Sequence, residues 1–184
     1  QAEKGLTGYA DGARLLLQSM KPMGVNSLLG AVGSFLLVPS AYELAISTAL
    51  GEYVDTIIFK DSAEVDKSLD FLIEKKTRGS IFPLDAINLP GSIRIDQRKA
   101  PGGQDEIIGI ASELVKYPPE YRDIVDLLLG QVIVVKDRSV ARALLSGSNW
   151  RSLPGLRVVT LTGALYLVNG LTAVGSSRGG ILSR

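Results

Sequence analysis

The chain of 184 residues contains no cysteine and no histidine. Without cysteine, disulfides, thiolate zinc sites and cysteine nucleophiles are excluded. Without histidine, the usual general base, a Ser-His-Asp triad and the commonest metal ligand are excluded as well. The sequence also lacks a Gly-Lys-Ser/Thr run, so the Gly-rich stretch at 175–180 does not match a P-loop for nucleotide phosphates. We therefore expect no cofactor and no metal.

The sequence also has little net charge and no uninterrupted apolar span. Its 20 basic and 19 acidic side chains leave a net charge of +1, so any nucleic-acid binding must come from a local patch. Two uncharged stretches lie between Lys21 and Glu43 and between Arg157 and Arg178. Because Gly, Ser, Thr, Asn or Pro interrupt both, they predict buried strands and not membrane spans. The first residue is Gln1 and not Met, and a helical segment follows at once, so we expect a piece of a longer protein. No signal peptide is visible.

One segment of the sequence is repeated. Residues 28–56 (copy 1) match residues 107–135 (copy 2) at a constant offset of 79 (107 − 28). The identical pairs are Gly30 and Gly109, Pro39 and Pro118, Tyr42 and Tyr121, Leu50 and Leu129, and Gly51 and Gly130. Apolar positions match as well, among them Val54 and Ile133. A hydrophobic content of 46% is sufficient for two small, intimately packed lobes.

The periodicity within each copy predicts helices and strands in the same order. Apolar residues at helical spacing predict a helix in copy 1 and another in copy 2, followed by strands at 53–59 and 132–135. A second helix with the stripe Val65, Leu69, Leu72 and Ile73 is capped by Asp61 or Ser62. The two helical stripes of the copies are Tyr42, Ala45, Ile46, Ala49 and Leu50, and Tyr121, Ile124, Val125, Leu128 and Leu129. A helix at 140–145 and late strands at 81–84 and 157–162 complete the pattern.

The tail of the chain carries three spaced glycines: Gly163, Gly170 and, after Val174, Gly175. Glycines in a β-rich stretch permit positive φ and close approach of another backbone. Taken alone, they are explained by tight turns between strands. Their spacing is similar to the pattern G-x6-G-x3-G-G of the hinge domain of structural maintenance of chromosomes (SMC) proteins, with Val174 in place of a glycine. Thr162 also departs from the family, whose late strand commonly ends in Leu-Asp.

Other stretches resemble the same family along nearly the whole chain. They are Gly8-Tyr9, residues 38–43 (VPSAYE), 49–51 (ALG), 82–85 (FPLD), 129–130 (LG), 157–161 (RVVTL) and the C-terminal 179–184. The resemblance implies an α+β fold with two pseudo-symmetric lobes, each a small mixed sheet packed by helices. It also implies a bacterial, cytoplasmic and nucleoid-associated parent protein with an ATPase head and coiled-coil arms. The domains expected are a lead-in from an arm (1–23), lobe 1 (24–90), a connector (91–106), lobe 2 (107–178) and an exit to an arm (179–184).

In function, the resemblance implies a homodimerisation module that contacts DNA or acts as a gate for it. The DNA binding that it implies is weak and depends on salt. The dimer-interface residues carried over by motif position are Gly163, Gly170 and Gly175. Basic residues near the chain ends or in the connector are candidates for DNA contact; they are Lys4, Arg14, Arg94, Arg98, Lys99, Arg178 and Arg184.

Two other functions remain open from the residues. An enzyme could use acidic pairs among Asp55, Asp61, Asp85 and Glu113, although these positions fit helix caps and strand ends. A small-ligand binding domain would place a pocket between the two lobes.

Overall fold

The computed structural model describes residues 8–85, 106–147 and 155–175, and these form two compact units. Unit 1 comprises Gln1–Phe35 and Glu52–Leu89, and unit 2 comprises Leu36–Gly51 and Pro90–Arg184. Residues 36–51 belong to copy 1 of the repeat but pack within unit 2. The lobe boundaries expected from sequence stay a prediction.

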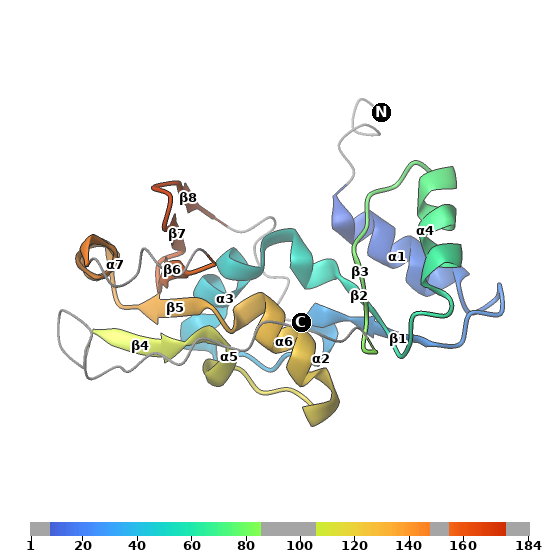
Figure 1. Cartoon of the computed structure of the whole chain (residues 1–184), viewed down its shortest axis with the longest axis horizontal. Helices are drawn as coiled ribbons and strands as arrows, with labels where there is room; N and C mark the ends of the chain where they lie inside the picture. Colours follow the sequence, from blue (N-terminus) through green and yellow to red (C-terminus); the bar gives the residue numbers. More distant parts are fainter. Residues whose placement is uncertain (1–7, 86–105, 148–154, 176–184) are drawn as a thin grey trace. The chain divides into compact units, whose positions relative to one another are not determined.

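Unit 1 is a three-stranded mixed sheet covered by two helices (Figure 1). The central strand β2 (Ile57–Phe59) pairs antiparallel with β1 (Leu28–Ala31) and parallel with β3 (Ile81–Pro83). Helices α1 (Tyr9–Ser19) and α4 (Val65–Glu74) pack against each other and supply much of the core. That core contains Ala13, Leu16, Met20, Val25, Ile57, Phe59 and Leu72.

Unit 2 is a five-stranded mixed sheet with the order β4-β5-β6-β7-β8. Its strands are β4 (Ile107–Ile110), β5 (Val132–Val135), β6 (Arg157–Thr160), β7 (Ala164–Leu167) and β8 (Thr172–Val174). All four residues of β5 are buried, as expected for a continuous β-branched strand inside a sheet. Helix α7 (Arg138–Ser146) covers a core of Ile107, Ile133, Val135, Val140, Ala141, Leu144, Leu156 and Val158.

The repeat is visible in the local structure of both copies. In copy 1, β1 is followed by α2 (Val32–Phe35), a 3-10 turn η2 (Ser40–Tyr42) and helix α3 (Glu43–Leu50). In copy 2, β4 is followed by α5 (Ala111–Leu114), η5 (Pro119–Tyr121) and α6 (Arg122–Leu129). Gly30 and Gly109 adopt φ of +143° and +153° at the same irregularity in strand register. These two glycines are therefore matched because both strands need the same non-standard backbone.

The match between the copies shifts after the helix. Leu28 pairs with Phe59 in copy 1, whereas Ile107 pairs with Val135 in copy 2, so the central strands are offset by 76 (135 − 59) and not 79. The difference is absorbed by the 3-10 turn η3 (Gly51–Asp55). The expected match of Val54 with Ile133 is therefore wrong, because Val54 lies in this turn and the position equivalent to Ile133 is Ile57, as the pairs Ala31–Ile57 and Ile110–Ile133 show. For the same reason, the strand expected at 53–59 is shorter.

Helix α4, which follows copy 1, also differs from the expectation. The residues of α4 that are buried are Ser68 and Leu72, whereas Ile73 is 73% exposed. Ser68 can lie inside because its hydroxyl donates to the Glu64 carbonyl at 3.1 Å. The N-cap residue is Glu64, without a side-chain capping bond, so neither Asp61 nor Ser62 caps this helix.

Within unit 2, the two copies meet at equivalent residues. Leu37 and Lys116, which differ by the repeat offset of 79, exchange two backbone hydrogen bonds, Leu37 N to Lys116 O at 2.8 Å and Lys116 N to Leu37 O at 2.9 Å. The Arg157 guanidinium donates to Ala49 O at 2.7 Å and to Leu128 O at 2.6 Å, and these carbonyls also stand at equivalent positions. Both belong to the last turn of a helix, α3 or α6. The contacts thus follow a local two-fold symmetry.

Among the described residues, no helix is long and apolar enough to cross a membrane. The two uncharged stretches instead contribute β1, α2 and the strands β6 to β8. The expectation of buried strands holds for most of β6, but it is wrong for β1, which is half-buried, and for β8, which is exposed. The expected α+β architecture with small mixed sheets is confirmed.

Candidate functional site

The three tail glycines all occupy positions with positive φ at the ends of strands. Gly163, Gly170 and Gly175 have φ of +87°, +94° and +86°. Gly163 donates to Thr160 O at 3.0 Å in the turn between β6 and β7, and Gly170 donates to Leu167 O at 3.0 Å in the turn between β7 and β8. Gly175 follows β8 and donates to Gly163 O at 3.2 Å. The backbone conformation of the chain itself therefore explains why each of these positions is a glycine.

The surroundings separate Gly163 from the other two glycines. Gly163 is buried against α3, where an added Cβ would lie 3.0 Å from Leu44 Cγ and 3.2 Å from Thr48 Oγ1. Around Gly170 and Gly175, an added Cβ would meet no described atom within 4 Å. A bulky residue at Gly163 would disturb packing within unit 2, so it does not test an interface. That these glycines lie at a dimer interface stays a prediction.

Strand β8 forms an exposed edge of the five-stranded sheet (Figure 1). All three of its residues are exposed; Val174 is 78% exposed and the preceding Leu171 is 59% exposed. Among the described residues, β8 pairs with β7 alone. Val174 lies inside the strand, and the only described residue other than glycine with positive φ is Lys76. The backbone at 174 therefore does not require the glycine that is usual in the family pattern.

The hydrogen bonds of the hairpin show which groups of β8 face outward. Leu171 accepts from Leu167 N at 2.9 Å, and Gly175 donates to Gly163 O. Because bonds to a neighbouring strand alternate along an antiparallel pair, the N–H groups of Thr172 and Val174 face away from β7. An exposed edge with outward N–H groups and apolar side chains is a template for pairing with another strand.

Of the expected DNA-contacting residues, one lies in the described part of the chain. Arg14 projects from α1 with its side chain 63% exposed and pairs with Asp11 at 3.1 Å. The others lie outside the described residues: Lys4, Arg94, Arg98, Lys99, Arg178 and Arg184.

The structure reveals a basic cluster that sequence reasoning missed, formed by Lys75, Lys76 and Arg78 after α4. The Arg78 guanidinium lies 4.9 Å from the centre of the Tyr9 ring and pairs with Glu52 at 3.0 Å. Tyr9 in turn lies 6.2 Å from Tyr53, which is 51% exposed. Exposed cations beside aromatic rings are typical of surfaces that bind single-stranded nucleic acid. The run Lys-Lys-Thr-Arg in the sequence indicates the basic character of this cluster. It does not indicate the aromatic neighbours, because these are distant in sequence.

The acidic residues considered for catalysis mostly fix local structure. Asp61 Oδ1 accepts from Ala63 N at 3.1 Å, and Asp85 Oδ2 accepts from Ser62 N at 3.1 Å and from Ser62 Oγ at 2.9 Å. Asp85 follows strand β3, as expected for a strand end, whereas Asp61 fixes a local turn and does not cap α4 as expected. In the part of the chain that the structure describes, no three carboxylates group to hold a metal ion.

Comparison with known proteins identifies the family. The family model of the SMC proteins flexible hinge domain matches residues 25–145. The chain therefore belongs to the SMC hinge family. It is 27% identical to the chromosome partition protein Smc of Bacillus subtilis, over 85% of this chain and 13% of that protein. With the Smc protein of Halothermothrix orenii it shares 28% identity, over 96% of this chain and 14% of the relative. The chain thus spans a small part of these relatives.

Solved hinge structures agree with this assignment. An asymmetric dimer of the Geobacillus stearothermophilus SMC hinge domain matches with a TM-score of 0.80 and 29% identity, covering 98% of this chain and 71% of that one. The Pyrococcus furiosus SMC hinge domain matches with a TM-score of 0.66 and 24% identity, covering 97% and 86% of the two chains, and supports the fold.

Proposed function

We propose that this chain is the homodimerisation module of a bacterial chromosome-partition protein, located in the cytoplasm at the nucleoid. In this proposal the chain ends connect to coiled-coil arms, and an ATPase head lies elsewhere in the parent protein. The observation that carries the dimer is the exposed outer edge of β8. The dimeric state of the Geobacillus hinge supports it.

The partner strand that we propose for β8 is β3 of a second copy. In unit 2, β6 pairs in parallel with the central strand β5, and β7 occupies its other side. In unit 1, β3 pairs in parallel with the central strand β2, and no described strand occupies its other side. A symmetric dimer would form this pairing twice, since each protomer supplies one β8 and one β3. Gly170 and Gly175 would then flank the interface.

Replacing Val174 with proline tests the β8 edge. Because the Val174 N–H faces away from β7, V174P removes a donor from the outer edge without removing a bond of the β7–β8 hairpin. We expect the wild-type chain to have about twice its 19.6 kDa mass in light scattering at micromolar concentration. V174P is expected to weaken dimerisation at least about tenfold, because one or two intermolecular hydrogen bonds are lost.

The matched control is Val174→Thr, which keeps the N–H group and the β-propensity of the strand. It should remain dimeric with an affinity near that of the wild type. A V174P chain that keeps wild-type dimer affinity would rule out β8 as the pairing edge. A monomeric wild-type chain would contradict dimerisation itself.

We further propose that the basic cluster of Lys75, Lys76 and Arg78 contacts DNA weakly, with Arg14 as an additional contact. The double variant Lys75→Gln/Lys76→Asn should weaken binding of a single-stranded oligonucleotide in fluorescence anisotropy. Loss of two phosphate contacts should reduce the slope of log affinity against log salt by about 1.4. Asparagine suits position 76 because Lys76 has φ of +52°. The control Arg138→Gln/Arg142→Gln removes the same charge from exposed positions on α7; equal effects of both pairs would exclude a specific site.

A further inference from the structure

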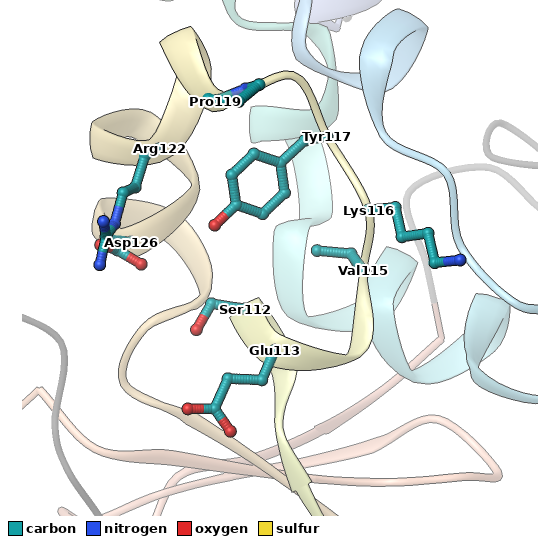
Figure 2. Close-up of a pocket in the computed structure, with 8 residues that line it drawn as sticks. All are labelled: Ser112, Glu113, Val115, Lys116, Tyr117, Pro119, Arg122 and Asp126. Carbon is teal, nitrogen blue, oxygen red and sulfur yellow. The ribbon is translucent and has the colours of Figure 1, made fainter.

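A pocket of about 720 Å³ opens in unit 2 between α5, the segment 115–118 and α6 (Figure 2). Its lining combines hydroxyls, carboxylates and an aromatic ring, and Figure 2 shows the Tyr117 ring standing within it. The residues that line the pocket are Ser112, Glu113, Val115, Lys116, Tyr117, Pro119, Arg122 and Asp126.

The polar lining is specific to copy 2. At the offset of 79, the counterparts in copy 1 have different chemistry: the titratable groups become neutral or apolar, apart from an arginine that becomes a glutamate. The pairs are Glu113 and Ser34, Lys116 and Leu37, Tyr117 and Val38, Arg122 and Glu43, and Asp126 and Ser47. Both copies nevertheless form the same succession of short helix, 3-10 turn and helix. The fold of the unit therefore does not require these side chains, and folding does not explain them.

Ser112 supplies an independent sign of a ligand. Its residue is only 6% exposed, yet its hydroxyl forms no hydrogen bond with any other described residue. No fully enclosed polar side-chain atom of the described residues lacks a partner, so the Ser112 oxygen still reaches the pocket space. In Figure 2 this oxygen lies on the same side as the Glu113 and Asp126 carboxylates. A buried hydroxyl with unused bonding capacity is satisfied by a group that enters the pocket.

At Tyr117, the effect of the Asp126 charge on the pKa is larger than that of Arg122. Burial raises the pKa of Tyr117 above its ordinary value, the charge of Asp126 raises this pKa further, and Arg122 opposes the shift as the smallest of the three causes. Arg122 makes only a loose ion pair, 3.8 Å from Nε to Asp126 Oδ2, with its side chain 77% exposed. The Lys116 ammonium points away from the Tyr117 ring in Figure 2. The side of the pocket with Ser112, Glu113 and Asp126 therefore presents acceptors and negative charge.

We propose that this pocket binds an organic cation, a primary ammonium or guanidinium group. Asp126 and Glu113 accept charge-assisted hydrogen bonds from it, and Ser112 adds a neutral acceptor. The face of Tyr117 adds a cation–π contact. The volume and the open mouth admit either a free polyamine or a lysine or arginine side chain of a protein.

Titration followed by amide resonances of the 184-residue chain tests this proposal. The probes are spermidine for the free amine, and N-acetyl-arginine amide and N-acetyl-lysine amide for a protein side chain, at constant ionic strength. We expect saturable shifts centred on Ser112, Glu113, Tyr117 and Asp126. The tighter-binding probe identifies the source of the cation. Asp126→Ser introduces the residue found at the equivalent position of copy 1, and should weaken binding about tenfold because a charge-assisted bond is lost.

The matched control is Asp70→Ser on α4, which removes the same charge from an exposed position outside the pocket and should leave the affinity unchanged. Equal weakening by the two variants, shifts that do not saturate, or preferential binding of acetate or phosphate would each overturn the proposal. The number and dispersion of resonances show for each variant that the chain is folded, so a loss of binding is not confused with unfolding.

Discussion

The two copies of the repeat share a backbone but differ in what is built onto it. Both place a glycine of φ near +150° in their first strand, and both continue through a short helix, a 3-10 turn and a helix. Within the described residues, copy 2 alone leads on to the hairpin of β7 and β8 and to the charged pocket. The shared part is therefore the scaffold. The unshared parts carry the β8 edge proposed for dimerisation and the proposed ligand site.

A second difference concerns how the copies are joined in unit 2. The bridge between Leu37 and Lys116 follows the local two-fold symmetry, with each copy supplying the same kind of contact. Arg157, in contrast, is a single residue outside the repeat that binds the equivalent carbonyls of Ala49 and Leu128. Its positive charge suits both, because the last carbonyls of a helix carry partial negative charge. One side chain thus serves two symmetric helix ends.

The largest expected effect comes from removing the Arg157 guanidinium, which donates to both helix ends. Arg157→Met should destabilise the chain by about 3 kcal/mol, because two part-buried carbonyls lose a charged donor. Arg157→Lys should recover only part of the loss, since one ammonium does not reproduce the planar fork. Urea unfolding followed by circular dichroism measures both variants.

The control for Arg157 is Arg122→Met, whose side chain is 77% exposed and makes only the loose pair with Asp126. That variant should change stability by less than about 0.5 kcal/mol. If Arg157→Met changed stability as little as Arg122→Met, the carbonyls of Ala49 and Leu128 would not depend on Arg157, and this side chain would not contribute to joining the two copies.

A smaller effect is expected from the caps of the helices that follow the two copies, which also differ. After copy 2, Asp137 Oδ1 accepts from Val140 N at 3.1 Å and from Ser139 Oγ at 2.9 Å. After copy 1, Glu64 does not cap α4; its Oε2 accepts from Ser27 Oγ at 2.8 Å. The bond from Val140, with that from Ser139, lowers the pKa of Asp137 below its ordinary value of 3.8.

This lowered pKa fixes the sign of a pH dependence. Because the folded-state pKa lies below the unfolded one, the contribution of Asp137 is present above the unfolded value and is lost as pH falls through the folded value. Asp137→Ala should slightly lower the thermal midpoint at pH 7. Asp137→Ser should retain the cap but lose this part of the acid dependence. Thermal unfolding between neutral pH and pH about 3 measures the difference, and parallel curves for wild type and Asp137→Ser would contradict it.

Much of the local structure was predictable because it depends on periodicity and backbone chemistry. The helical stripes of α3 and α6 are confirmed: Ala45, Ile46, Ile124 and Val125 are all buried. Periodicity was insufficient for α4, because both the pair Ser68 and Leu72 and the predicted apolar stripe have helical spacing. Spacing alone therefore does not show which of the two faces the core. Only the packing against α1 selects between them, and this choice leaves Ile73 in solvent.

The candidate sites were predictable to a lesser degree. The tail glycines were identified from spacing. That spacing does not reveal that Gly163 packs on α3, whereas an added Cβ at Gly170 would meet no described atom within 4 Å. The cluster of Lys75 and Arg78 with Tyr9 depends on segments far apart in sequence. The two hydrogen bonds of Arg157 were not predictable either, because their acceptors are backbone carbonyls, which every residue possesses.

The sequence by itself determined that a unit is duplicated, that each copy folds into small helices and strands, and that the chain has the pattern of an SMC hinge. These features follow from local preferences and from residue identities, which the sequence contains directly. Only the tertiary structure decided that residues 36–51 pack in unit 2, that β8 lies at the edge of its sheet and that the pocket forms in copy 2. Such features depend on which surfaces meet at long range, where burial and hydrogen bonding of distant segments outweigh any local preference.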